Sequence, residues 1–233
     1  MLPPSRVLES GQTMAGPARI IVQTTTRMCR LIRPVRPGLH SGGVRRYYDA
    51  MNMLQSTIVD SELSTVFLKY SRKKLLDEYW PRLKSAVEPL NDQQIWWRPN
   101  AASNSIGNLI LHLNGNVTQW LVASFNGYRD ERNRPVEFKE RRLVPGHELL
   151  ERMGATMAAA GETLLHLTPE HLTRVYEIQG YTVTGLDAIY QVVEHFGLHY
   201  GQILWIVKAT TGADLGFYSG LNATGRAGSG TSE

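Results

Sequence analysis

Residues 184–211, TGLDAIYQVVEHFGLHYGQILWIVKATT, decide the fold of this chain. Apolar residues fill most of the stretch, and its only charged residues are Asp187, Glu194 and Lys208. Thr184 is a good amino-terminal cap, and the glycine that follows the stretch is a good carboxy-terminal stop. The pattern predicts one helix over 184–211, and a helix that is apolar over most of its surface is expected to be buried.

The same helix carries an unusual polar band. With an advance of about 100° per residue, four polar side chains fall within about 80° of one another. They are Gln191, His195, His199 and Gln202. A solvated band on a bundle helix normally holds Lys, Glu and Arg, whereas this band holds His and Gln. We therefore expect it to face a crevice or an internal cavity.

His195 and His199 lie one helical turn apart, so both imidazoles can reach one metal ion. The alternative is a pair of core histidines satisfied by hydrogen bonds, which is the commoner meaning of this spacing. A third ligand would favour the metal site. His112 is the candidate, because it lies in a second helical segment, NLILHLNGN, at the edge of the apolar stripe. That position suits a crevice between two helices; the alternative is an exposed histidine at the helix edge.

Three further amphipathic segments are predicted helices, over 62–88, 103–126 and 146–167. Pro81 predicts a kink or a break in the first, and Ser103 is the expected amino-terminal cap of the second. Residues 128–144, YRDERNRPVEFKERRLV, are charged and aperiodic, and we expect a long solvated crossover there. Residues 174–184, RVYEIQGYTVT, are expected to form a small hairpin. Together these features predict an all-α fold, a four-helix bundle.

The formal net charge of +4 is unevenly distributed. Residues 1–50 hold eight arginines, no lysine and two acids, whereas the rest of the chain has a net charge of −2. We expect residues 1–55 to be a disordered Arg/Pro/Gly-rich tail, residues 56–218 to be the bundle domain, and residues 219–233 to be a flexible tail. The basic tail can equally be a transit peptide or an over-extended gene start.

The charge distribution also bears on partners and location. Because the basic charge belongs to the tail, the domain itself is not expected to bind nucleic acid. The chain has one cysteine, Cys29, so no disulfide within the chain is expected. No apolar run approaches the roughly 18 residues of a membrane span. The expectation is a cytoplasmic protein with a small-molecule substrate and no membrane partner; a homodimer is left open.

Two longer stretches resemble the DinB superfamily of four-helix-bundle metalloproteins, and most of all a bacterial branch with no assigned function. They are LLDEYWPRLKSAVEPLNDQQIWWRPNAASNSIGNLILHLNGNVTQW and, later, AIYQVVEHFGLHYGQI. The resemblance covers about 62–218. It implies an up-down-down-up order of helices, with the long crossover between the second and third.

The resemblance also implies a metal site. In that superfamily one histidine on the second helix and two on the fourth typically bind a divalent metal, and these fall on His112, His195 and His199. Zn²⁺ is the expected ion, with Ni²⁺, Fe²⁺, Co²⁺ and Mn²⁺ as alternatives. Some relatives look like thiol-dependent transferases or isomerases, which makes a low-molecular-weight thiol a candidate co-substrate. No cluster of Arg or Lys that would bind such a thiol is expected on the histidine face.

Three residues near the histidines are candidates for supporting roles. Glu194, Asn116 and Gln202 would orient a ligand or a substrate, although Glu194 is equally expected at the surface. Three functions follow from the sequence. The first is a metal-dependent S-transferase or hydrolase, and the second is a non-catalytic metal-binding module of a stress response. The third, nucleic-acid contact through the basic tail, is the least favoured.

Overall fold

The structure is a computed structural model that describes residues 41–219. The chain divides into two units, Met1–Gln55 and Ser56–Glu233, and each is described by itself. Helix α2 (Ser41–Arg72) begins within the first unit, so residues 41–55 are helical where the sequence analysis expects a disordered tail. The remainder of the predicted amino-terminal tail and the predicted carboxy-terminal tail from 220 onward lie outside the described residues.

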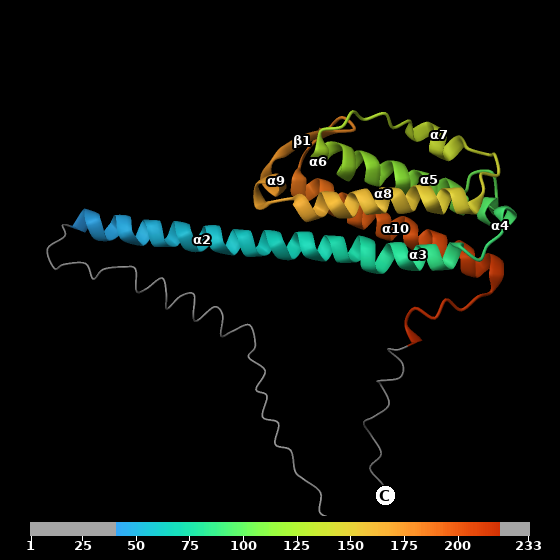
Figure 1. The fold of residues 1–233 in the computed structure, drawn as a ribbon, viewed down its shortest axis with the longest axis horizontal. Coiled ribbons are helices and arrows are strands. Elements are labelled where there is room, and N and C mark those ends of the chain that lie inside the picture. The colour runs from blue at the N-terminus through green and yellow to red at the C-terminus, as the bar shows by residue number, and fades with distance from the viewer. Residues whose placement is uncertain (1–40, 220–233) are drawn as a thin grey trace, which may run out of the picture. The chain divides into compact units, whose positions relative to one another are not determined.

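Four long helical segments form the bundle of the second unit. They are α2 with its continuation through α3 (Trp80–Val87), α5 (Ile106–Val117) with α6 (Ser124–Asn126), α8 (Gly146–His166), and α10 (Gly185–Thr211). Figure 1 shows that α5 and α8 run in one direction, while α3 and α10 run in the other. The up-down-down-up order expected from the sequence is therefore present, and the crossover from α6 to α8 passes along the length of the bundle.

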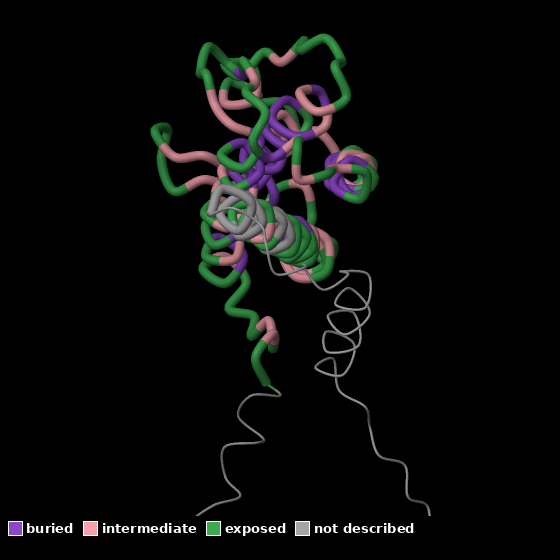
Figure 2. The backbone as a smooth tube through the Cα atoms, turned by 90° about the vertical axis from the view of Figure 1, so that its left-hand side faces the viewer, coloured by how far each residue is buried: buried purple, intermediate pink, exposed green. Residues whose placement is uncertain are grey.

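The core lies where these helices face one another. Buried positions gather on the inner sides of the bundle helices, and exposed positions cover the outer sides (Figure 2). Leucine, isoleucine and methionine make up most of the core, with Phe196 of α10 among its largest fully buried side chains. Apolar burial of this kind, at about 25 cal/mol per Å², is the main free energy that holds a helix bundle together.

The first bundle helix continues through Pro81 without a break. A π-helical turn, η1 (Lys73–Tyr79), lies just before Pro81, and the backbone N–H of Trp80 donates to Leu75. The wider turn changes the hydrogen-bond pattern upstream of the proline ring, which would otherwise clash with the carbonyl four residues earlier. The kink or break predicted at Pro81 takes the form of this π-helical turn, and α3 continues to Val87.

The second bundle helix begins two residues later than predicted. Ser105, not Ser103, is its amino-terminal cap, and Asn108 completes a capping box with it. The Ser103 hydroxyl instead donates to Asn100 in the preceding turn, so its side chain is used before the helix begins. A second π-helical turn, η2 (Thr118–Ala123), joins α5 to α6, and Gly127 ends the helix with a left-handed φ of 69°.

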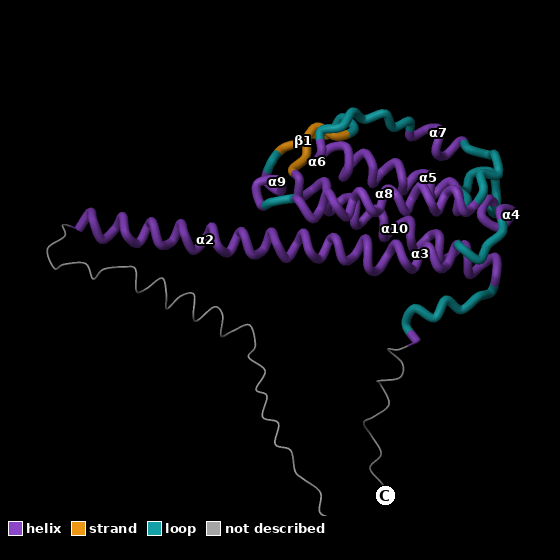
Figure 3. The backbone as a smooth tube through the Cα atoms, in the orientation of Figure 1, coloured by secondary structure: helices purple, strands orange, loops and turns teal. Residues whose placement is uncertain are grey.

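Short elements close the two ends of the bundle. Helix α4 (Asp92–Trp96) places the Trp96 indole against the core, where its N–H donates to the Val144 carbonyl. At the other end, α9 (Pro169–Thr173) leads into an antiparallel hairpin of β1 (Val175–Ile178) and β2 (Tyr181–Thr184) (Figure 3). The hairpin predicted over 174–184 is therefore confirmed, as is the all-α class of the fold.

Helix α10 is less buried than the sequence predicts. Its inner side belongs to the core, but four large apolar side chains on its outer side are 44–63% exposed. They are Leu186, Tyr190, Leu198 and Trp205. The helix packs against α3 and α5 on one side only, so its other side meets solvent despite its apolar composition. Among the described residues, no helix is both long and apolar enough to cross a membrane.

Two glycines in bundle helices give a matched test of the packing. A Cβ at Gly107 of α5 would lie 2.8 Å from the Trp96 ring, whereas a Cβ at Gly201 of α10 would meet nothing within 4 Å. We expect Gly107→Ala to lower the free energy of unfolding by about 1–3 kcal/mol, because a buried ring has to move. We expect Gly201→Ala to raise it by about 0.5–1 kcal/mol, since alanine favours a helix. Urea unfolding followed by circular dichroism measures both; equal shifts would contradict this packing.

Candidate metal centre

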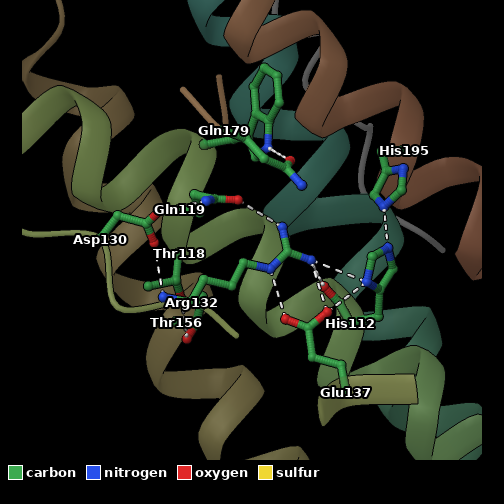
Figure 4. A network of polar contacts seen from close by, with 10 residues as sticks. His112, Thr118, Gln119, Asp130, Arg132, Glu137, Thr156, Gln179 and His195 are labelled. Carbon is green, nitrogen blue, oxygen red and sulfur yellow. Dashed lines mark hydrogen bonds and ion pairs between the residues drawn. The ribbon is translucent and has the colours of Figure 1, made fainter. Parts of the chain in front are cut away.

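Three histidines from two helices meet between α5 and α10. His112 comes from α5, and His195 and His199 come from one face of α10. One ring nitrogen of each lies within 4.8 Å of the other two, and Nε2 of His112 is 2.9 Å from Nε2 of His195. Figure 4 shows these last two rings pointing toward each other. The site predicted from the sequence is thus brought together in space.

The donor set fits a divalent transition metal. Zinc binds imidazole nitrogen at about 2.0–2.1 Å, so two ligands of a tetrahedral ion lie roughly 3.3 Å apart. Separations of 2.9 Å to 4.8 Å between the histidine nitrogens bracket that spacing. The group consists of three imidazole nitrogens and no carboxylate, which suits Zn²⁺, Ni²⁺, Co²⁺ or Fe²⁺ better than Mg²⁺ or Ca²⁺.

His112 is the buried member of the group and is held from behind by a carboxylate. Its side chain is 2% exposed, and its Nδ1 lies 2.7 Å from Oε2 of Glu137. A carboxylate at Nδ1 keeps the proton on that nitrogen and leaves Nε2 as the electron-pair donor facing the other histidines. Metal-binding histidines are usually held in this way, because the second hydrogen bond fixes both the tautomer and the ring orientation.

Arg132 secures the carboxylate in turn. Its Nε donates to Oε1 of Glu137 at 2.7 Å, and its Nη2 donates to Oε2 at 2.9 Å, which makes a bidentate pair. The remaining donor, Nη1, bonds to Gln119 at 3.0 Å, and Gln119 donates to Asp130. Figure 4 shows this chain of contacts running from Asp130 to His195. A buried network of this kind is rigid because most of its polar atoms have partners.

Glu137 lies on helix α7 (Arg134–Lys139), which places its side chain at the site. Asn108 of α5 anchors its end, since the Asn108 amide donates to the carbonyls of Glu137 and Glu140 at 2.9 Å and 3.1 Å. Gly115 lets the network approach α5 closely: a Cβ there would lie 2.2 Å from Oε1 of Glu137 and 2.8 Å from Nε of Arg132. The segment HLNGN therefore supplies both the ligand and the space behind it.

The electrostatic setting favours neutral imidazoles and an ionised carboxylate. Burial lowers the pKa of His195 to about 3, with the charges of the other histidines and of Arg132 and Arg134 adding to the effect. Burial also lowers the pKa of His199, although its hydrogen bond to Gln202 opposes the shift. For Glu137, burial alone would raise the pKa, but hydrogen bonds from His112 and Arg132 outweigh it and hold the pKa below the ordinary value. Neutral imidazole is the form that binds metal.

The three supporting residues suggested by the sequence fall in different places. Oε1 of Gln202 lies 2.7 Å from Nδ1 of His199, so Gln202 orients that ring. Asn116 is 3% exposed on α5, one turn beyond His112, and its Oδ1 has no hydrogen-bond partner within the described part of the chain. Glu194 is exposed on α10, and no contact joins it to the histidines in the region the structure describes.

One expectation about the crossover is wrong. Residues 128–144 are not a purely solvated connection, because the Arg132 and Glu137 side chains are only 6% and 11% exposed. Arg132 also comes from this segment, and its Nη2 lies 3.1 Å from Nδ1 of His112, behind the ring. Spacing along one helix cannot reveal a residue that reaches the site from a crossover. The segment RPVEFK, with Pro at a helix start, was the one available signal of α7.

Comparisons with known proteins place the chain in a family. Residues 62–219, which include the whole bundle from the end of α2 to the end of α10, match the family described as protein of unknown function (DUF1572). The chain belongs to the DUF1572 family. No curated protein matches the chain.

One solved structure shares the fold of this DUF1572 chain. It is a conserved protein from Enterococcus faecalis, 15% identical with a TM-score of 0.54, over 62% of this chain and 97% of the other. A DinB-like protein from Bacillus cereus is 14% identical with a TM-score of 0.48, over 59% of this chain and 88% of the other. The family match and the shared fold describe a helix-bundle protein of unknown function.

Removing the charge behind His112 tests the role of the carboxylate. We expect Glu137→Gln to weaken metal binding by about 10–100-fold, because a neutral amide holds the Nδ1 proton less strongly than a carboxylate does and leaves Arg132 uncompensated. Competition with a chromogenic chelator measures the affinity. Glu140→Gln is the matched control, since Glu140 pairs with Arg142, whose side chain is 84% exposed. Equal affinities for wild type and Glu137→Gln would rule out this role.

The depressed histidine pKa makes the metal-free protein sensitive to acid. The pKa of His195 is about 3 in the folded state against 6.5 for the free side chain, so the unfolded chain binds more protons between these values. The free energy of unfolding is therefore expected to fall as pH drops from about 6.5 toward 3. Urea titrations in chelator at several pH values measure the slope, and His195→Asn should make it shallower. An unchanged slope in that variant would contradict the burial of the imidazole.

Proposed function

We propose that the chain binds one divalent metal ion through His112, His195 and His199, and that the centre activates a small molecule for thiol transfer or for hydrolysis. Zn²⁺ is the proposed ion, with Ni²⁺, Fe²⁺, Co²⁺ and Mn²⁺ as alternatives. The observation that carries the proposal is the convergence of three imidazole nitrogens within 4.8 Å, one of them backed by a carboxylate at 2.7 Å.

The number of protein ligands favours a catalytic centre over a structural one. The described residues supply three donors to this group, whereas structural zinc sites generally have four. A bound ion with free positions supplies Lewis-acid chemistry, in that it lowers the pKa of a water or a thiol. The donors come from long, well-packed helices, which hold a site more tightly than loops do.

The chain's own residues have distinct parts in this proposal. Glu137 holds the proton of His112 at Nδ1, and Gln202 does the same for His199, so that both rings present Nε2 to the site. Asn116 offers a buried carbonyl oxygen without a partner, one turn from His112. Such an oxygen can accept a hydrogen bond from a substrate group, and its burial without one carries a free-energy cost of about 1–3 kcal/mol.

A non-catalytic metal-binding module is the second candidate. The observation that favours it is the direct contact of α5 with α10 through the histidines, because an ion there would link two bundle helices. The two functions differ in one measurement. A structural ion should stabilise the fold by many kilocalories per mole, whereas a catalytic ion at a preformed site adds less. Nucleic-acid contact through the basic tail stays a third, least favoured hypothesis, and residues 1–40 lie outside the described part.

Metal content tests the site itself. We expect full-length protein purified without an affinity tag to contain about one equivalent of a transition metal by elemental analysis, and His199→Ala to lose most of it. His166→Ala is the matched control, because His166 is exposed at the end of α8 and its Nδ1 lies 2.8 Å from a carbonyl of its own helix. Unchanged metal content in His199→Ala would refute the assignment of the ligands.

A further inference from the structure

The crossover brings two arginines to the metal centre, and they are in different situations. Arg132 donates hydrogen bonds to Glu137 and Gln119, and the Glu137 carboxylate balances its charge. Arg134, two residues later at the start of α7, has no hydrogen bond or ion pair within the part of the chain that the structure describes. Both cations act on His195.

Arg134 is held at the edge of the centre by an aromatic ring. Its guanidinium lies 4.9 Å from the centroid of the Phe138 ring, and Phe138 lies 4.5 Å from the ring of His112. A guanidinium over an aromatic face keeps its N–H donors free in the plane of the group. The Phe138 ring thus holds an exposed, unpaired cation one aromatic ring away from His112.

Both arginines line a hollow beside the buried network of Arg132. Arg132, Arg134, Gln119 and the hairpin residue Gln179 all line it. Gln179 has a φ of 56°, a conformation that is strained for a residue other than glycine, and its side chain accepts from the Trp120 indole. Two acids, Asp130 and Glu131, also line the hollow. Asp130 already accepts from Gln119 and from the backbone of Arg132.

The balance of charge at the loaded centre is positive. Arg132 and Arg134 carry two positive charges against the three negative charges of Glu137, Asp130 and Glu131, and a divalent ion would bring the sum to one positive charge. A ligand that only donates an electron pair to the ion would leave Arg134 without a partner. A ligand with a second, anionic group would satisfy both, because Arg binds carboxylate and phosphate with two parallel hydrogen bonds.

We propose that the small molecule bound at this centre carries an anionic group, a carboxylate or a phosphate-like group, and that Arg134 on its Phe138 platform binds that group. The inference rests on the proposed function, since it assumes that the ligand's other end lies at the three-histidine site. Arg134 is then a residue that determines specificity, whereas Arg132 positions Glu137.

Visible spectra of the Co²⁺-loaded full-length protein test this proposal, because a thiolate that reaches the ion changes them. The probes are 3-mercaptopropionate, its uncharged amide, and 2-mercaptoethylphosphonate, which separates the two kinds of anion. We expect at least one anionic thiol to bind about five- to tenfold more tightly than the amide, and Arg134→Ala to abolish that preference. Arg134→Lys should keep part of it, since the charge remains.

Lys139→Ala is the matched control, because it removes an exposed positive charge from the same short helix. It should keep the preference of the wild type. Equal affinity of wild type for the anionic thiols and the amide, or an undiminished preference in Arg134→Ala, would overturn the inference while leaving the metal site intact. Failure to bind Co²⁺ would overturn the proposed function and this inference together. Uptake of Co²⁺ without binding of any thiol would exclude thiol transfer and overturn the inference.

Discussion

The hydrogen bond between His112 and Glu137 is the contact on which the candidate site depends. It joins a buried helix of the bundle to the crossover segment, whose helix α7 packs against α5. Because the Glu137 carboxylate is buried beside its arginine, separating it from His112 would leave a buried charge short of a partner, which is costly. The crossover is therefore held against α5 by the same contact that would prepare the imidazole for a metal.

Much of the bundle could be predicted from the sequence, since helix periodicity and caps are local signals. Thr184, Gly127 and the turn at Gln179 are where simple rules expect them. The three histidines could be singled out because two share a helix face and the third sits in a second helix. The partners of His112 could not, because Arg132 and Glu137 lie in an aperiodic charged segment, where spacing carries no information about what each side chain reaches.

The apolar composition of α10 predicts a more deeply buried helix than the structure has, for a different reason. A helix in a four-helix bundle packs against neighbours on one side, and composition alone does not say how many neighbours it has. Trp205 and Leu198 remain exposed although they are as apolar as the residues of the core. The polar band of His195 and His199 lies at the border between the buried and exposed sides, which explains why those rings are only partly covered.

The direction of the helices determines which segment of such a protein can change in sequence without disturbing the core. Because α5 and α8 run in the same direction, the chain must return along the bundle between them, and Glu137 of this return segment contacts His112. The bundle requires this return path but sets few demands on its residues, while the site takes Arg132, Arg134 and Glu137 from it. Chains with this topology can therefore alter what reaches the three histidines by exchanging one surface segment, without repacking a single core helix.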